Sequence, residues 1–154
     1  MTSINLNTFE LGTAKGVVQY LPSSNVFTCQ VYKSLSGTLK AGQPVKLVAG
    51  VAGQITVTAC SAESDKVFGV IPLRHKVNGY VAGDLVEVAS DYSVITMEAA
   101  GAITQYSAVK VAGSGYDQVD AIAGDESPAA AQIGIALDAA AAEGDLIRVL
   151  IKCL

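Results

Sequence analysis

A period-two alternation of apolar and polar residues recurs along this chain, and it constrains the fold more than any other feature. Short runs rich in Val, Ile, Leu and Thr alternate with polar residues, as is typical of β-strands. The runs that predict strands are 43–50, 54–60, 85–90, 93–99, 107–113 and 146–152. Because Gly, Ser, Asn and Asp separate these runs at short intervals, the sequence predicts a mainly β fold, a small sandwich or barrel-like domain.

Several turns can be placed between these runs. Gly113 and Gly115 are expected to join the run at 107–113 to a partner strand in a hairpin. Gly50 and Gly53 indicate a second hairpin, and Ser90-Asp91 a further turn. The Ala-rich stretch 127–145 has helix-forming composition, and Pro128 could begin a helix. Since Gly134 separates two isoleucines, we predict a strand at Gln132–Leu137 and a loop or single helical turn after it.

One phrase occurs twice. "AGDLVEVAS" at 82–90 and "EGDLIRVLI" at 143–151 both place Gly-Asp-Leu before an alternating strand, and each follows an apolar-Gly-apolar segment, "FGVIPL" or "IGIAL". A fainter copy, "KAGQPVKLV", has Gln-Pro in place of Asp-Leu. Gly83 and Gly144 are expected to take a turn conformation that other residues resist, and Asp84 and Asp145 to fix the bend by bonding their own backbone. The repeat also places Glu87 and Arg148 at equivalent outward positions.

The alternative for Asp84 and Asp145 is a pair of catalytic carboxylates. Nothing in the sequence brings the two side chains to working distance, so we interpret them as structural turn residues. "SAVK" at 107–110 has the spacing of a nucleophile–base motif, but in a strand its Ser and Lys point to opposite faces. His75 is the one histidine, and no acidic cluster has calcium-loop spacing. We therefore expect no enzymatic activity, no catalytic residue, no cofactor and no bound metal.

Composition narrows the class of partner. The 154 residues are enough for one domain, and Lys+Arg 10 against Asp+Glu 14 gives a net charge of −4. The densest basic stretch is only Arg74-His75-Lys76, so we do not expect the basic patch of a nucleic-acid binder. Cys29, Cys60 and Cys153 form no metal or redox spacing and are interpreted as buried thiols of a protein made in a reducing cytoplasm. The sequence has neither a signal-peptide pattern nor an apolar run of membrane-spanning length. We expect no nucleic-acid, membrane or small-molecule partner.

Residues 1–33 differ in composition and in polar–apolar pattern from residues 34–154. They carry Phe9, Phe27 and Tyr32, and they include the turn-forming stretch Pro-Ser-Ser-Asn. Two interpretations stay open at this point: an extended N-terminal arm that docks on another subunit, or edge strands of the β-rich domain at 34–154.

The chain from about residue 34 to its end resembles the small capsid decoration, or cement, proteins of tailed bacteriophages. The resemblance rests on "AGQPVKLV", "FGVI", "AGDLVEV", "AITQYSAVKVAGSG" and above all the closing "IGIALDAAAAEGDLIRVLI". Proteins of that family are mostly β and are structural, with no active site. The resemblance implies a virion location on the outer capsid surface, the major capsid protein as partner, and a homotrimer that stabilises the expanded capsid against internal DNA pressure.

The residues expected to contact the capsid are Phe9, Leu11, Phe27 and Tyr32, which would lie along the shell or pair as an added strand. Two alternatives stay open. One is another virion part, such as a head-fibre base or a tail module, which would share the β-rich composition. The other is a ligand-binding β-barrel or enzyme, which would require a pocket with convergent polar groups.

Overall fold

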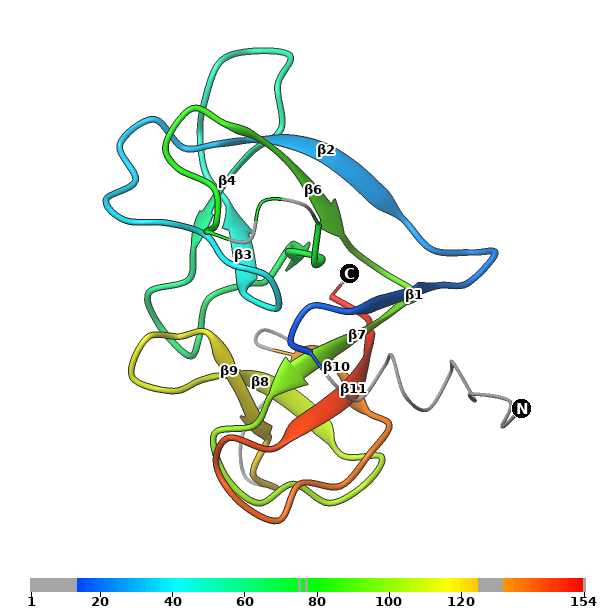
Figure 1. Ribbon diagram of the computed structural model, residues 1–154. Helices are drawn as coiled ribbons and strands as arrows, with labels where there is room; N and C mark the ends of the chain where they lie inside the picture. The colour runs from blue at the N-terminus through cyan, green and yellow to red at the C-terminus, as the bar shows by residue number, and fades with distance from the viewer. Residues whose placement is uncertain (1–13, 75, 77, 125–131, 154) are drawn as a thin grey trace, which may run out of the picture.

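The computed structural model describes residues 14–74, 76, 78–124 and 132–153, and within these ranges the chain is all β with no helix. The prediction of a mainly β, barrel-like fold is confirmed. Eleven strands are present in the described residues (Figure 1): β1 (Val18–Tyr20), β2 (Val26–Val31), β3 (Pro44–Leu47), β4 (Thr56–Ala59), β5 (Gly69–Val70), β6 (Leu85–Ala89), β7 (Ser93–Glu98), β8 (Ala108–Ala112), β9 (Gln118–Ala121), β10 (Gln132–Ala136) and β11 (Leu146–Ile151).

The strands form two sheets, one at each end of the molecule. A closed five-stranded barrel has the order β2-β4-β3-β5-β6, and a six-stranded sheet has the order β1-β7-β11-β10-β8-β9. The barrel lies at the top of Figure 1 and most of the six-stranded sheet at the bottom. The predicted turn at Ser90-Asp91 is present, but it carries the chain from one sheet to the other, because β6 and β7 do not pair with each other.

The two sheets repeat one topology, which we describe as a first half (26–89) and a second half (90–153). In each half the first and last strands pair antiparallel, β2 with β6 and β7 with β11. Hairpins β3–β4 and β8–β9 correspond, and β5 and β10 each pair with the hairpin's first strand and with the last strand. The barrel closes through parallel β2–β4 pairing, and the second half has a single parallel bridge, Ala99 to Val119, at the same place. The repeated phrase therefore belongs to a tandem structural repeat.

The strand register explains why a glycine, Gly69 or Gly134, lies in the apolar segment that precedes each copy of the repeated phrase. Gly69 pairs with Val45 in the first half, and Gly134 pairs with Val109 in the second. A β-carbon on Gly134 would lie 1.9 Å from the carbonyl oxygen of Leu150, and one on Gly69 would lie 2.6 Å from the carbonyl oxygen of Ala89. Only glycine allows the neighbouring backbone to approach this closely.

The Gly-Asp turns before β6 and β11 have the geometry that the sequence suggested. Gly83 has a φ of 85° and Gly144 a φ of 91°, in the left-handed region that favours glycine. The carboxylates of Asp84 and Asp145 each accept a hydrogen bond from the backbone N–H three residues earlier, at 2.9 Å and 3.1 Å. Each aspartate therefore closes the turn that launches the last strand of its half.

The turn before β3, the first strand of the β3–β4 hairpin, is also closed by a side-chain oxygen that accepts from a backbone N–H. In the fainter copy the side-chain oxygen of Gln43 accepts from the backbone N–H of Lys40 at 2.9 Å. At the equivalent turn of the second half, Tyr106 takes a φ of 67° where Gly42 of the first half has 77°. The second half thus accepts a strained tyrosine where the first half has glycine.

Each half has its own apolar cluster. The first lies inside the barrel and contains Cys29, Val31, Leu39, Val45, Val57, Phe68, Ile71, Val86 and Val88. The second is built mainly from the second half, but Cys60, Val67 and Val70 of the first half belong to it. Because residues of the first half complete the second cluster, we expect the two halves to unfold together.

The N-terminal segment joins both sheets. β1 pairs with β7 at the edge of the six-stranded sheet, and β2 lies within the barrel, with Cys29 and Val31 buried. Residues 14–33 thus supply an edge strand and a barrel strand, while residues 1–13 of the expected arm lie outside the described residues.

Candidate interaction surface

The four residues predicted to contact the capsid fall in different places. Phe9 and Leu11 lie outside the described residues. Phe27 packs against the barrel core, with its ring centroid 5.0 Å from that of Phe68, so only the exposed part of the ring could contact a partner. Tyr32 is half-buried and lines a surface hollow on the barrel.

The hollow lies where the β3–β4 hairpin loop passes over the end of β2. It has a volume of about 170 Å³, and its lining consists of Gln30, Tyr32, Lys33, Gly50, Val51 and Thr56. The parallel pairing of β2 with β4 sets Gln30 beside Thr56, and the backbone N–H of Gln30 donates to the carbonyl of Ile55 at 2.8 Å. The hydrogen-bonded backbone therefore holds the floor of the hollow in place.

Exposed apolar side chains lie at and beside this hollow. Val51, which lines it, is 52% exposed, and Leu85, the β6 residue that pairs with Gln30, is 67% exposed. We call Gln30, Tyr32, Val51 and Leu85 the barrel patch. Sequence reasoning missed its two aliphatic members, although the alternation of the run 85–90 places Leu85 on the same outward face as Glu87.

A tyrosine–arginine–glutamate contact joins the two sheets. The hydroxyl of Tyr20 on β1 donates to Oε1 of Glu87 on β6 at 2.6 Å. Arg74 Nη2 donates to the hydroxyl oxygen of Tyr20 at 2.6 Å and to the same Oε1 of Glu87 at 2.7 Å. Burial and the hydrogen bond to Glu87 raise the pKa of Tyr20 to about 12. The hydrogen bond from Arg74 lowers the pKa of Glu87 below its ordinary value, so all three groups keep the protonation state in which they bind one another.

The second half has the corresponding ion pair with the charges exchanged. Arg148, at the position equivalent to Glu87, donates to both carboxylate oxygens of Asp138 at 2.8 Å and 2.7 Å. The hydrogen bonds from Arg148 hold the pKa of Asp138 below its usual range despite partial burial. In each half an ion pair thus joins the segment after β5 or β10 to the last strand, β6 or β11. The acidic residue is on the last strand in the first half and the basic residue is on it in the second.

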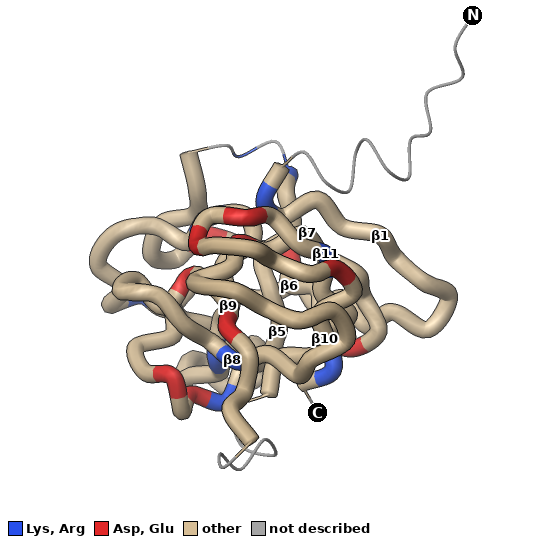
Figure 2. The backbone as a smooth tube through the Cα atoms, turned by 90° about the horizontal axis from the view of Figure 1, so that it is seen from below, with Lys and Arg blue, Asp and Glu red and all other residues tan. Residues whose placement is uncertain are grey.

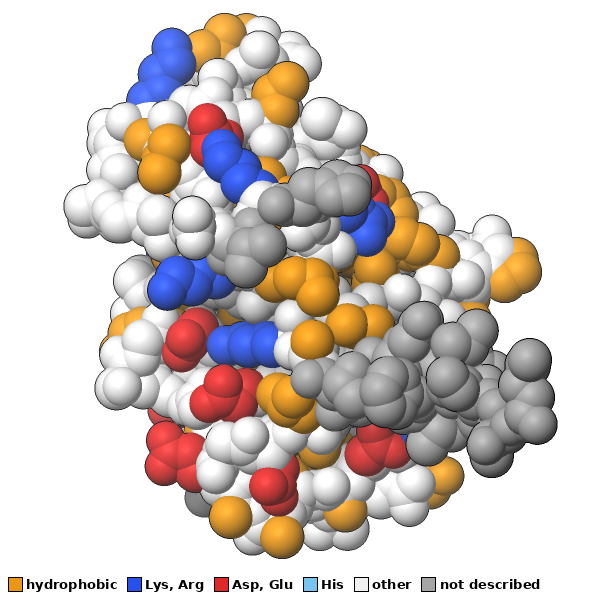
Figure 3. Space-filling model, viewed as in Figure 1, with side chains coloured by type: hydrophobic (Ala, Val, Ile, Leu, Met, Phe, Trp, Pro, Cys, Tyr) orange, Lys and Arg blue, Asp and Glu red, His pale blue; other side chains and the backbone are white. Residues whose placement is uncertain are grey.

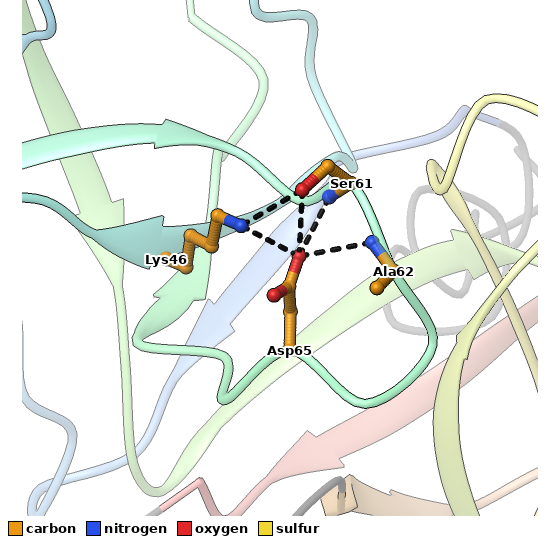
Figure 4. A network of polar contacts seen from close by, with 4 residues as sticks. All are labelled: Lys46, Ser61, Ala62 and Asp65. Carbon is orange, nitrogen blue, oxygen red and sulfur yellow. Dashed lines mark hydrogen bonds and ion pairs between the residues drawn. The ribbon is translucent and has the colours of Figure 1, made fainter.

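Asp65 organises the loop between β4 and β5 (Figure 4). One of its oxygens accepts from the backbone N–H groups of Ser61 and Ala62 at 2.6 Å and 3.0 Å, and from Lys46 Nζ at 2.8 Å. Burial acts to raise the pKa of Asp65, but these hydrogen bonds outweigh it and lower the pKa. This carboxylate oxygen therefore serves to order the loop.

Asp84 and Asp145 are likewise used within their own halves. Asp84 forms an ion pair with Lys76 in addition to closing its turn, and Asp145 accepts from the backbone N–H groups of Ala141 and Ala142. The structure does not bring these two aspartates together as a pair.

The described residues show neither a metal cluster nor a reactive thiol. Within them, no group of three or more His, Cys, Asp or Glu side chains could hold a metal ion. Burial raises the pKa of Cys29 to about 11 and that of Cys60 to about 12, and it also raises the pKa of Cys153, so all three stay protonated near neutral pH. No helix in the described part of the chain is long and apolar enough to cross a membrane.

Charge divides the molecule along the same line as the repeat. Residues 26–89 carry six Lys and Arg against four Asp and Glu, a net charge of +2, whereas residues 90–154 carry three against nine, a net charge of −6. On the face drawn in Figure 3, acidic side chains gather over the lower part and basic side chains over the upper and middle parts. Seen from below in Figure 2, acidic positions are spread along the strands and loops of the second half.

Comparison with solved structures identifies a similar fold. The chain resembles the protein in "The crystal structure of head fiber gp8.5 N base in bacteriophage phi29", with a TM-score of 0.52 and 19% sequence identity over 84% of this chain and 94% of that one. At this identity the likeness shows a shared fold, and it extends over nearly the whole of the solved chain. No protein-family model and no curated protein sequence matches the chain.

Proposed function

We propose that this chain is a structural protein of a bacteriophage virion that binds the outside of the expanded head. The observation that carries the proposal is the fold shared with a phage head-fiber base over most of both chains. Because one fold can serve many functions, this support is by analogy. The resemblance of residues 34–154 to capsid decoration proteins is a second argument, drawn from sequence rather than from shape.

The proposed role is binding, with no enzymatic activity and no cofactor. The charged groups on which a site could be built are engaged in structural contacts: Asp65 in a loop, Glu87 in the contact between the sheets, and Asp138 in an ion pair. The barrel patch is instead an exposed apolar surface around a small hollow, which suits contact with another protein.

The proposed partners are the major capsid protein and further copies of the chain, in a trimer. A trimer contacts several capsid subunits at once, so that weak contacts reinforce one another through effective concentration. If the trimer binds only the expanded lattice, it stabilises that lattice by mass action. This would oppose the pressure of packaged DNA.

A second candidate is the base of a head fibre, which the likeness to the phi29 head-fiber base favours. Both candidates place the chain on the head. Electron microscopy of decorated particles separates them, because a fibre base carries a projecting density that a cement protein lacks.

Cosedimentation with capsids tests the proposal. We expect purified protein to bind expanded capsids and not unexpanded ones, and bound capsids to withstand a higher temperature. Equal binding to both forms, or to neither, would overturn the proposal.

A deletion variant tests the N-terminal arm. Deleting residues 1–13 leaves β1 in place, whereas a cut after residue 20 would also remove Tyr20 and its bond to Glu87. The shorter deletion should abolish capsid binding and leave a folded protein. Normal decoration by the deleted protein would exclude a role for Phe9 and Leu11.

A further inference from the structure

Two exposed surfaces lie at opposite ends of the molecule. The barrel patch is at the end formed by β2, β6 and the β3–β4 hairpin loop. At the other end, loops 99–107 and 137–145 run side by side, joined by hydrogen bonds between Ile103 and Ala140 in both directions at 2.9 Å. We call these two segments the loop end. Figure 1 shows it at the bottom, below β11, and the barrel at the top.

Tyr106 is the most exposed large apolar residue described, with 69% of its surface accessible. Its φ of 67° is costly for a residue with a side chain, and the equivalent turn of the first half has Gly42. The backbone is nevertheless well held, because the N–H of Tyr106 donates to the carbonyl of Ala136 at 2.7 Å. Tyr92 has a similar φ of 65°, so the distinguishing feature of Tyr106 is its greater exposure on an ordered turn, which suits an aromatic contact with a partner.

The two ends are complementary in chemistry. The barrel patch is apolar, has Lys33 at its rim, and belongs to the half with a net charge of +2. The loop end presents the ring of Tyr106 where its two segments meet at Ala136, and the exposed acidic residues Glu143 and Asp145 where they meet at Ala99, in the half with a net charge of −6. One copy of the chain thus carries both members of a matching pair of surfaces.

We propose that the loop end of one copy docks on the barrel patch of the next, with Tyr106 against Val51 and Leu85 and Glu143 facing Lys33. The contact is heterologous, since two different surfaces meet, so it forms a ring when the rotation between copies closes. A ring of three would be the trimer of the proposed function. The inference rests on that proposal for the number of copies only, because the pairing of surfaces follows from the chain itself.

Mixing two variants tests the pairing. Val51→Glu disables the barrel patch, and Tyr106→Gly disables the loop end while suiting the positive φ of that turn. Each variant alone should self-associate about thirtyfold more weakly or worse than the wild type, as expected for a central contact residue. An equimolar mixture should form a dimer and stop there, because each mixed pair keeps one intact contact and cannot close a ring.

Matched controls are available on the same chain. Val26 is a valine, 42% exposed on β2, and Tyr92 is a tyrosine, 44% exposed, with a φ of 65°. Val26→Glu and Tyr92→Gly should assemble like the wild type in sedimentation velocity. Circular dichroism and thermal melting of every variant establish that it is folded. The wild-type assembly should also weaken as salt is raised, since opposite charges help to hold it.

Several outcomes would overturn the proposal. They are a wild-type chain that stays monomeric at high concentration, a mixture that forms no dimer, and controls that lose assembly as the test variants do. Capsid cosedimentation keeps the two proposals distinguishable. Self-association without capsid binding would leave the paired ends and refute the capsid role. Capsid binding by a monomer, lost on Val51→Glu, would make the barrel patch a shell contact and refute the pairing.

Discussion

Replacing Gly134 with alanine will destabilise the protein more than any other glycine-to-alanine change at a described position without a positive φ. A β-carbon there would lie 1.9 Å from the carbonyl oxygen of Leu150 and 2.9 Å from its carbonyl carbon, both backbone atoms that no rotamer change can move. To restore ordinary contact, β10 and β11 must separate locally by about 1.5 Å. That movement also stretches the hydrogen bonds between these two central strands.

The size of the effect follows from this geometry. Overpacking a well-packed interior costs about 1–3 kcal/mol, and weakening one or two strand hydrogen bonds adds about 1 kcal/mol each. Alanine returns about 0.5–1 kcal/mol by restricting the unfolded chain. We therefore expect Gly134→Ala to lower the free energy of unfolding by about 3 kcal/mol, a fall in Tm of about 6–12 °C for a chain of this length.

Two further glycines complete the series. Gly69→Ala, at the equivalent position of the first half, should cost about 2 kcal/mol, because its closest contacts are 2.6 Å rather than 1.9 Å. Gly101→Ala should change the free energy of unfolding by less than about 0.5 kcal/mol, since its added β-carbon would lie 3.8 Å from the nearest atom, Oδ1 of Asp120. Because tryptophan is absent, far-ultraviolet circular dichroism in urea is the suitable assay. If Gly134→Ala were as stable as Gly101→Ala, the close approach of β10 and β11 would be refuted.

Three other predictions follow from the ionisable groups. The lowered pKa values of Asp65 and Asp138 mean that their stabilising contribution is present above pH 4 and is lost as pH falls below the ordinary carboxyl value of 3.8; urea titrations of Asp65→Asn should show a flatter acid limb than those of the wild type. The raised pKa values of Cys29 and Cys60 predict that a thiol reagent reacts slowly at pH 8 until urea unfolds the protein, and rapid labelling of the folded chain would contradict this burial. In a spectrophotometric titration of the folded protein, Tyr20→Phe should remove a late tyrosinate step near pH 12, and an unchanged curve would exclude the contact between Tyr20 and Glu87.

The strands that local pattern could predict are those with clear alternation. The runs at 43–50, 54–60, 85–90, 93–99, 107–113 and 146–152 all contain a strand of the structure. The strand predicted at Gln132–Leu137 is β10 plus one residue. Gly134 is needed inside this strand because the backbone of Leu150 on β11 passes close to it.

Local pattern could not supply the pairing between distant strands. Closure of the barrel depends on parallel pairing of β2 with β4, a non-local contact that neither strand's sequence records. β5 has only two residues, too few to show a period. The barrel patch was missed for the same reason, since Gln30 and Leu85 become neighbours only when β2 and β6 come together.

The exchanged charges of the two ion pairs bear on how a chain with two similar halves folds correctly. Repeated sequences risk pairing a strand of one copy with the partner intended for the other. If β11 took the place of β6 in the barrel, Arg148 would face Arg74, and the reverse exchange would set Glu87 beside Asp138. Both mispairings bring like charges together at a partly buried contact, so each is disfavoured while the correct pairing gains an ion pair. Because the last strand carries a negative charge in one half and a positive charge in the other, each half favours pairing with its own last strand during folding.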